Sequence, residues 1–272
     1  MICAKPGPLA SALSLFTDRS VNRTVRFKKL GTHMTQTQWL IIIVCGVVLS
    51  LIASIVRDWL KSRREKPIYL AVAGSLNLTF SVDASMESLP QRDEFFLLTG
   101  KDSQHIPYML SGKLDNVGVR ILDYTCSNYS GSQGRRRTRR QTIVMFQLHD
   151  YEWPDLMMMP DSFALKLTKV LGMKDIDIGN ASGFSKRYFL NGRDDAAIRR
   201  VFRQEVTDAF MLRNDWCVEA HGEVIVFWIK DRRVPPNDIR SFLVETMDLL
   251  QLLSGIKVTR EWIGPDDALR RI

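Results

Sequence analysis

The sequence has few of the residues from which most catalytic and metal sites are built. Its 272 residues include only four cysteines and four histidines. The cysteines form no CxxC pair, and the histidines show neither HExxH nor HxH spacing, so the usual zinc-site patterns are absent. So few cysteines in so long a chain also speak against a disulfide framework and fit a reducing compartment.

Phosphate-binding and hydrolase signatures are missing as well. No GxxxxGK[ST], GxGxxG or GxSxG pattern occurs in the sequence. The sequence therefore favours a non-catalytic protein, and we expect no cofactor and no bound metal.

Positive charge is concentrated in two places rather than spread along the chain. The formal net charge is +8, yet residues 1–66 carry 11 Lys and Arg against 3 Asp and Glu, and the remaining residues carry 27 of each. A nucleic-acid groove needs cations distributed over a folded face. This distribution therefore speaks against nucleic acid as a partner.

One long uncharged run, WLIIIVCGVVLSLIASIV, occupies residues 39–56. At ~1.5 Å per helical residue it covers about 27 Å, close to the hydrocarbon thickness of a bilayer. Trp39 and Trp59 bracket the run, as interfacial aromatic residues do. A buried core helix rarely lacks a polar face over this length, and the following RDWLKSRREK is unlike a signal-peptide cleavage site. The sequence predicts one transmembrane helix over residues 38–60.

The residues that flank this helix predict its orientation. A basic juxtamembrane segment, 61–66, follows it, and Met34 precedes it. If translation starts at Met34, no Lys or Arg lies upstream, and the positive-inside rule places the C-terminal domain in the cytoplasm. We therefore expect a single-pass protein of the cell inner membrane. Residues 1–37 are interpreted as a disordered arm or a misassigned start, with a mitochondrial presequence as the alternative.

The rest of the chain predicts an α+β fold, a soluble domain of antiparallel strands with packed amphipathic helices. Its first half, 67–160, is expected to be strand-rich, its second half, 161–254, to mix strands and helices, and 255–272 to form a C-terminal tail. The elements expected are a short helix from Pro67, a helix over 89–100, strands at 78–82, 106–114, 119–126, 141–148 and 174–179, a strand at Tyr188–Leu190, a helix capped by Asp194, a hairpin at 216–230 and a helix over Ile239–Leu253.

The run GRRRTRR at residues 134–140 contributes five arginines: Arg135, Arg136, Arg137, Arg139 and Arg140. Composition predicts that residues 127–140 form a loop at the tip of a hairpin. Charge runs are commonly solvated, so a mobile tip is one interpretation. The functional interpretation is contact with anionic lipid headgroups, since each cation close to such a surface contributes ~1 kcal/mol.

Two groups of side chains are candidates for catalysis. Cys217, Glu219 and His221 alternate along a predicted strand and would share one face, as a thiol, an acid and a base. However, His221 is expected in the turn, and a buried cysteine commonly packs as a small apolar residue. Asp175 and Asp177 form a DxD pair that would suit Mg²⁺, or they are two exposed acids that flank a buried isoleucine.

The most distinctive block is GFSKRYFLNGRDDAAIRRVF, residues 183–202. With RRQTIVMFQL, VEAHGEVIVFW and RRVPPNDIRSFLVETMDLL it resembles a set of bacterial proteins with one N-terminal membrane span and a cytoplasmic α+β domain. The pattern F-S-x-R-Y-x-L-x-G carries the resemblance, which covers about residues 38–254. The resemblance implies one membrane span followed by a cytoplasmic α+β domain, and it implies no activity.

These observations together predict a membrane-anchored interaction or scaffold domain that acts through the bilayer, through anionic lipid headgroups and through an unknown protein partner. The alternative is a hydrolase or transferase that uses Cys217 and His221, or Asp175 and Asp177.

Overall fold

The structure is a computed structural model that describes residues 36–130, 135–162, 173–179 and 183–257. The chain divides into two units, Met1–Val56 and Arg57–Ile272. Most of the expected N-terminal arm, and the expected tail from residue 258 onward, lie outside the described residues.

The first unit contains the beginning of α1, a helix that extends over Gln36–Ser75. Within it, the 19 residues Trp39–Arg57 are long and apolar enough to cross a membrane by length and composition, and none of them is buried. A signal sequence near an N-terminus shares these properties.

The part of α1 that belongs to the second unit packs on the folded domain. The predicted helix start at Pro67 is wrong, because α1 continues through this residue to Ser75. A proline inside a helix removes one backbone hydrogen bond. Tyr69, Ala73 and Leu76 follow it at helical spacing and are buried, and this apolar stripe stabilises the helix despite the lost bond.

The second unit is built on one eight-stranded antiparallel sheet in the order β1-β2-β3-β4-β8-β7-β5-β6, so the fold class is α+β, as predicted. Three 3-10 helices lie between β1 and β2, and hairpins connect β2 to β3 and β3 to β4. β5 and β6 pair beyond the β7–β8 hairpin, so both halves of the chain contribute to one sheet. The strands are β1 (Thr79–Ala84), β2 (Ser103–Leu114), β3 (Val117–Ser130), β4 (Arg135–Leu148), β5 (Trp153–Pro160), β6 (Tyr188–Gly192), β7 (Trp216–Gly222) and β8 (Val224–Ile229).

Proline marks the irregular positions of two strands. The pairing of β2 with β3 shifts register between His105 and Tyr108, around Pro107. The pairing of β5 with β7 shifts between Trp153 and Leu156, around Pro154. Since proline has no N–H for the ladder, it is tolerated within a sheet at such bulges.

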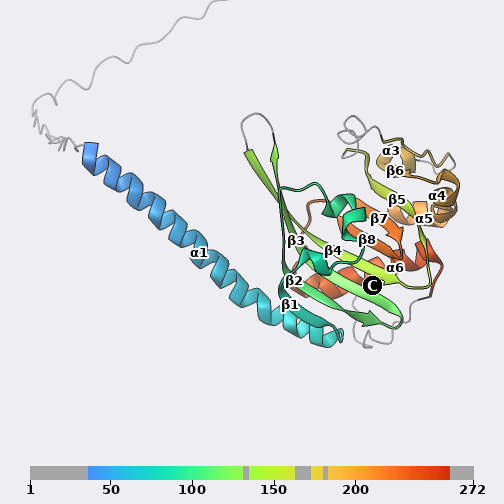
Figure 1. Ribbon diagram of the computed structural model, residues 1–272, viewed down its shortest axis with the longest axis horizontal. Helices are drawn as coiled ribbons and strands as arrows, with labels where there is room; N and C mark the ends of the chain where they lie inside the picture. The colour runs from blue at the N-terminus through green and yellow to red at the C-terminus, as the bar shows by residue number, and fades with distance from the viewer. Residues whose placement is uncertain (1–35, 131–134, 163–172, 180–182, 258–272) are drawn as a thin grey trace, which may run out of the picture. The chain divides into compact units, whose positions relative to one another are not determined.

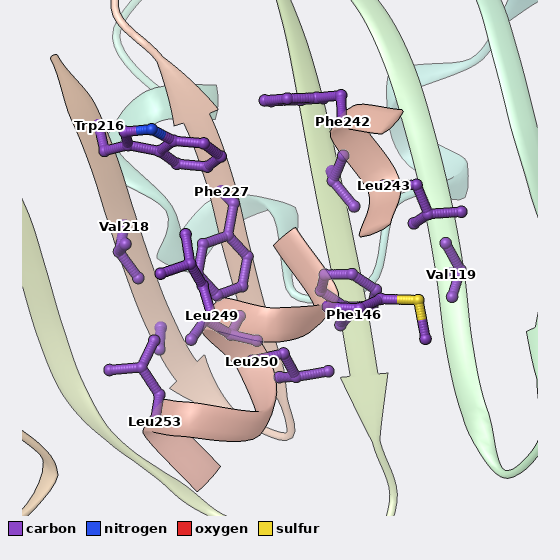
Figure 2. Packing of buried hydrophobic residues seen from close by; sticks show 14 of the residues in the cluster. Val119, Phe146, Trp216, Val218, Phe227, Phe242, Leu243, Leu249, Leu250 and Leu253 are labelled. Carbon is purple, nitrogen blue, oxygen red and sulfur yellow. The ribbon is translucent and has the colours of Figure 1, made fainter. Parts of the chain in front are cut away.

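Helices cover one face of the sheet. Side chains of this face form one apolar core with α4 (Asp195–Val201), α5 (Gln204–Met211), α6 (Ile239–Ser254) and the second-unit part of α1. Figure 2 shows apolar side chains of α6 facing those of β3, β4, β7 and β8. The labelled residues are Phe242, Leu243, Leu249, Leu250 and Leu253 from α6, and Val119, Phe146, Trp216, Val218 and Phe227 from the strands.

The opposite face carries a second apolar core. Three 3-10 helices cover it: η1 (Met86–Ser88), η2 (Arg92–Glu94) and η3 (Phe96–Leu98). The predicted single helix over 89–100 is therefore wrong. These turns bury Phe95 and Leu98, although their short length leaves most of their peptide groups without regular helical bonds.

Several other predicted elements are confirmed. Asp194 caps α4 by accepting a hydrogen bond from the Ala197 N–H at 2.9 Å. The closing helix α6 ends at Gly255, whose φ of 73° suits a glycine C-cap. Two further helices, α3 (Phe184–Arg187) and η4 (Pro236–Asp238), complete the described elements.

The predicted strand at residues 174–179 is wrong. Among the described residues, Ile176 donates one backbone hydrogen bond to the Leu190 carbonyl at 2.7 Å, beside the edge strand β6. No strand is assigned to this segment.

Candidate functional site

The five arginines of 135–140 lie in a strand rather than in a loop. β3 continues to Ser130 and β4 begins at Arg135, so the predicted loop over 127–140 is wrong, and only 131–134 lie between the two strands, outside the described residues. β2 pairs with β3 as far as Ser127, and β8 pairs with β4 only from Ile143. The end of the β3–β4 hairpin therefore extends beyond its neighbours (Figure 1). We call residues 127–130 and 135–140 the basic ribbon.

The base of the basic ribbon is held by acidic side chains. Arg139, which is half-buried, lies 3.4 Å from the Asp231 carboxylate. Arg140 lies 3.9 Å from the buried Asp123 carboxylate. Arg137 is exposed. Arg139 and Arg140 at the base of the basic ribbon are therefore paired, whereas Arg137 further along it is exposed.

Asp123 belongs to a buried ionic cluster on the helix-covered face. The Arg233 Nε donates to Asp123 at 2.8 Å, and its two Nη groups donate to the Glu65 carboxylate at 2.9 and 2.7 Å. Burial opposes the charge of Arg233, but its hydrogen bonds to Glu65 and Asp123 outweigh that effect and raise the guanidinium pKa. This cluster fastens α1 to β3 and was not predicted from the sequence, because its members are far apart in the chain.

The structure brings together two of the three residues of the Cys217 group. Glu219 and His221 lie in β7, where Glu219 pairs with Val226 and His221 pairs with Val224. His221 is therefore in the strand, and its predicted place in the turn is wrong. The His221 Nε2 lies 3.4 Å from Glu219, and its Nδ1 lies 3.0 Å from Asp155 of β5. Sequence reasoning missed Asp155.

Glu219 is a buried carboxylate that contacts three polar groups, two backbone N–H groups and the His221 ring. Its oxygens accept the backbone N–H groups of Phe96 at 2.5 Å and Leu97 at 3.1 Å. Through these bonds Glu219 holds the start of η3 against the sheet. Since a buried charge is costly unless it is paired and hydrogen-bonded, His221 is the natural counter-ion of this carboxylate.

His221 is suited to carry a proton rather than to remove one. Burial alone would lower the pKa of its imidazole, but hydrogen bonds to Glu219 and Asp155 outweigh burial and raise the pKa. When both ring nitrogens face carboxylates, the protonated ring donates to both. His221 and Asp155 also line a cavity of about 480 Å³ together with residues of η2.

Cys217 does not join this group as an activated nucleophile. Its side chain is buried, and burial raises the pKa of its thiol well above the ordinary value. Four residues along a strand span ~13 Å, so Cys217 and His221 share a face without meeting. A thiolate is the reactive form of cysteine, and this environment disfavours it.

The DxD pair has a structural arrangement. Asp175 accepts the Leu190 N–H at 3.0 Å, and burial raises the pKa of its carboxyl. Asp175 and Asp177 are both exposed, and Ile176 between them is buried, so the prediction of two exposed acids that flank a buried isoleucine is confirmed. In the part of the chain that the structure describes, no three His, Cys, Asp or Glu side chains are grouped so that they would hold a metal ion.

Two polar residues of the 183–202 block, Arg187 and Tyr188, also stabilise the fold. Arg187 donates to the Met211 carbonyl at 2.7 Å and to Asn214. The Tyr188 hydroxyl donates to the Arg213 carbonyl at 2.7 Å. Both side chains close the end of α5 onto β6.

Comparison of the chain with protein-family models, with curated proteins and with solved structures finds no match.

Proposed function

We propose that the protein is a single-span membrane protein whose C-terminal domain lies in the cytoplasm and acts by binding rather than by catalysis. The basic ribbon is its contact with anionic phospholipid, and the chain belongs to the set of bacterial single-span proteins that the 183–202 block resembles. The observation that carries the proposal is an apolar, membrane-length helix followed in the same chain by a projecting cationic ribbon.

The anchor is supported by length and composition. The 19 residues of Trp39–Arg57 reach about 28 Å as a helix, which matches a bilayer core of ~30 Å. The cations at its end and directly after it favour the cytoplasmic side under the positive-inside rule; they are Arg57, Lys61, Arg63, Arg64 and Lys66.

The lipid contact is supported by the shape and charge of the ribbon. A tether keeps the domain close to the bilayer, where each cation near an anionic surface contributes ~1 kcal/mol. Arg137 is exposed and neither neighbouring strand extends to it. Arginines at the end of a two-stranded ribbon can therefore approach headgroup phosphates without disturbing the core.

Flotation of residues 57–272 with lipid vesicles tests the contact, since this segment keeps Glu65 and the whole second unit. The variant R135Q/R136Q/R137Q leaves the two anchored arginines intact. At ~1 kcal/mol per cation, three substitutions reduce partitioning to phosphatidylglycerol vesicles about 100-fold. Phosphatidylcholine vesicles bind neither protein.

A control variant, K113Q/R199Q/R232Q, removes the same charge from exposed positions outside the ribbon. It should retain most of the binding. Equal loss in the two variants, at equal thermal stability, would show that net charge rather than the ribbon determines binding.

A further inference from the structure

The 183–202 block builds one wall of a cavity of about 600 Å³ on the helix-covered side of the second unit. Arg193, Asp194, Ala197, Arg200 and Val201 line it from this block. The opposite walls come from the segment that leads into β5 and from the end of α6.

Gly192 permits the close approach that forms this wall. A Cβ atom at this position would collide with the Asp155 carbonyl oxygen and with the Ile198 side chain. β6 therefore lies tightly against β5 here, and the chain leaves the strand directly into the rim residues Arg193 and Asp194. Gly192 and the N-cap residue Asp194 thus help to determine the shape of the cavity.

Two aromatic side chains form part of the cavity wall. The rings of Tyr151 and Trp153 lie with centroids 4.5 Å apart, and Trp153 is 2% exposed. The Trp153 Nε1 has no hydrogen-bond partner among the described residues. An indole N–H is a donor only, and a buried donor without a partner is costly, so an acceptor that reaches Nε1 would stabilise this wall.

Three arginines line the rim of the cavity, and they differ in how many partners their side chains have. Arg193 pairs with Asp155 at 3.0 Å yet is 86% exposed, and Arg203 donates to the Leu252 carbonyl at 2.7 Å. Arg200 is exposed and makes no side-chain hydrogen bond or ion pair with the residues that the structure describes.

Three acids also line the cavity, and two of them are already engaged. Asp155 accepts from His221 and pairs with Arg193, while Asp194 caps α4. Glu152 is exposed. Among the described lining groups, Arg200 and the Trp153 indole thus remain as donors and Glu152 remains as an acceptor.

We propose that this cavity binds a small organic anion through a carboxylate or phosphate group. Arg200 is the principal ligand-binding residue, Arg193 contributes from the other side of the rim, and the tyrosine and tryptophan rings contact the apolar part of the ligand. Guanidinium groups bind carboxylate and phosphate with strong charge-assisted hydrogen bonds. The site is separate from the basic ribbon and does not depend on the lipid contact.

The test uses the full chain in lipid nanodiscs, labelled with ¹⁵N at the six tryptophan indoles. Citrate supplies carboxylates and inorganic phosphate supplies phosphate, each titrated against chloride at matched ionic strength. We expect the Trp153 indole signal, assigned with W153F, to shift with saturation for at least one of the two anions. Which anion binds more tightly identifies the ligand class.

Arg200→Gln should weaken the binding about tenfold or more, since it removes a charge-assisted hydrogen bond. Arg199→Gln is the matched control, because Arg199 is an exposed neighbour on the same helix that does not line the cavity. Both positions are exposed, so both variants should fold. If neither anion produces a saturating shift, or if R199Q weakens binding as much as R200Q, the cavity is not an anion site.

Discussion

His221 illustrates how a single side chain can be both noticed in the sequence and misassigned. It was predicted in a turn, as the base for Cys217, whereas it lies in β7 between the carboxylates of Glu219 and Asp155. A strand alternation identifies which residues share a face, but not which side chain from another strand meets them. Asp155 comes from β5, 66 positions away along the chain.

The raised pKa of His221 predicts a pH-dependent stability. A group whose pKa is higher in the folded than in the unfolded state stabilises the fold below its unfolded pKa, ~6.5 for histidine, and loses that contribution as pH rises through the folded value. The free energy of unfolding, measured with urea on residues 57–272, should therefore fall as pH rises above the ordinary histidine range.

His221→Gln should remove this decline, while His149→Gln, at an exposed histidine beside Glu223, should preserve it. A decline of the same size in H221Q would mean that another group is responsible. Groups near His221 that could contribute are Glu87, Arg92, Asp93 and Glu94 along the adjoining cavity, with Arg193 on Asp155 and Lys101 near Glu219.

At the scale of elements, the ionic cluster of Glu65, Arg233 and Asp123 joins α1 to the sheet. Removing Arg233 would take away the guanidinium group that binds both Glu65 and Asp123, and the fully buried Asp123 carboxylate would keep Arg140 at the longer distance of 3.9 Å. Breaking a buried pair by deleting one partner costs about 3–5 kcal/mol. R233A should therefore lower the free energy of unfolding of residues 57–272 by roughly this amount.

Arg232→Ala is the matched control for this prediction, because Arg232 is the exposed neighbour of Arg233. A surface substitution of this kind changes stability within about 0.5 kcal/mol. Equal effects of R232A and R233A would show that the cluster does not secure α1.

Helices and strands with a regular hydrophobic period in the sequence were predicted well. Strands that depend on cross-strand pairing were not. α6 and the β7–β8 hairpin show a clear period in the sequence, and both are found. The basic ribbon has loop composition, yet β3 and β4 pair in continuous register from Val117 and Leu148 to Ser130 and Arg135. Cross-strand pairing overrides weak local propensity.

The candidate sites depend even more than the strands on contacts between residues that lie far apart in the sequence. The Cys217 and DxD groups were predicted from spacing, and the structure uses them for packing and backbone bonds. The cavity beside Arg200 draws its walls from β5, α4 and α6. No local pattern joins three such segments, so the cavity could not be predicted from the sequence.

For the whole molecule, the charge distribution and the apolar run are the strongest guides to function. The excess of Lys and Arg lies in residues 1–66, around the membrane-length stretch, and the remaining residues carry equal numbers of positive and negative side chains. This division suits a domain attached to a bilayer and held there by its anchor, with additional attraction through one ribbon.

Membrane topology in living cells is the most direct test of this account. The full chain with a C-terminal epitope tag is expressed in bacteria, membranes are extracted with alkaline carbonate, and intact spheroplasts are treated with protease. The account predicts that the protein stays in the membrane pellet and that the tag is digested only after the spheroplasts are lysed. Release of the protein by carbonate, or digestion of the tag in intact spheroplasts, would contradict a single span with a cytoplasmic domain.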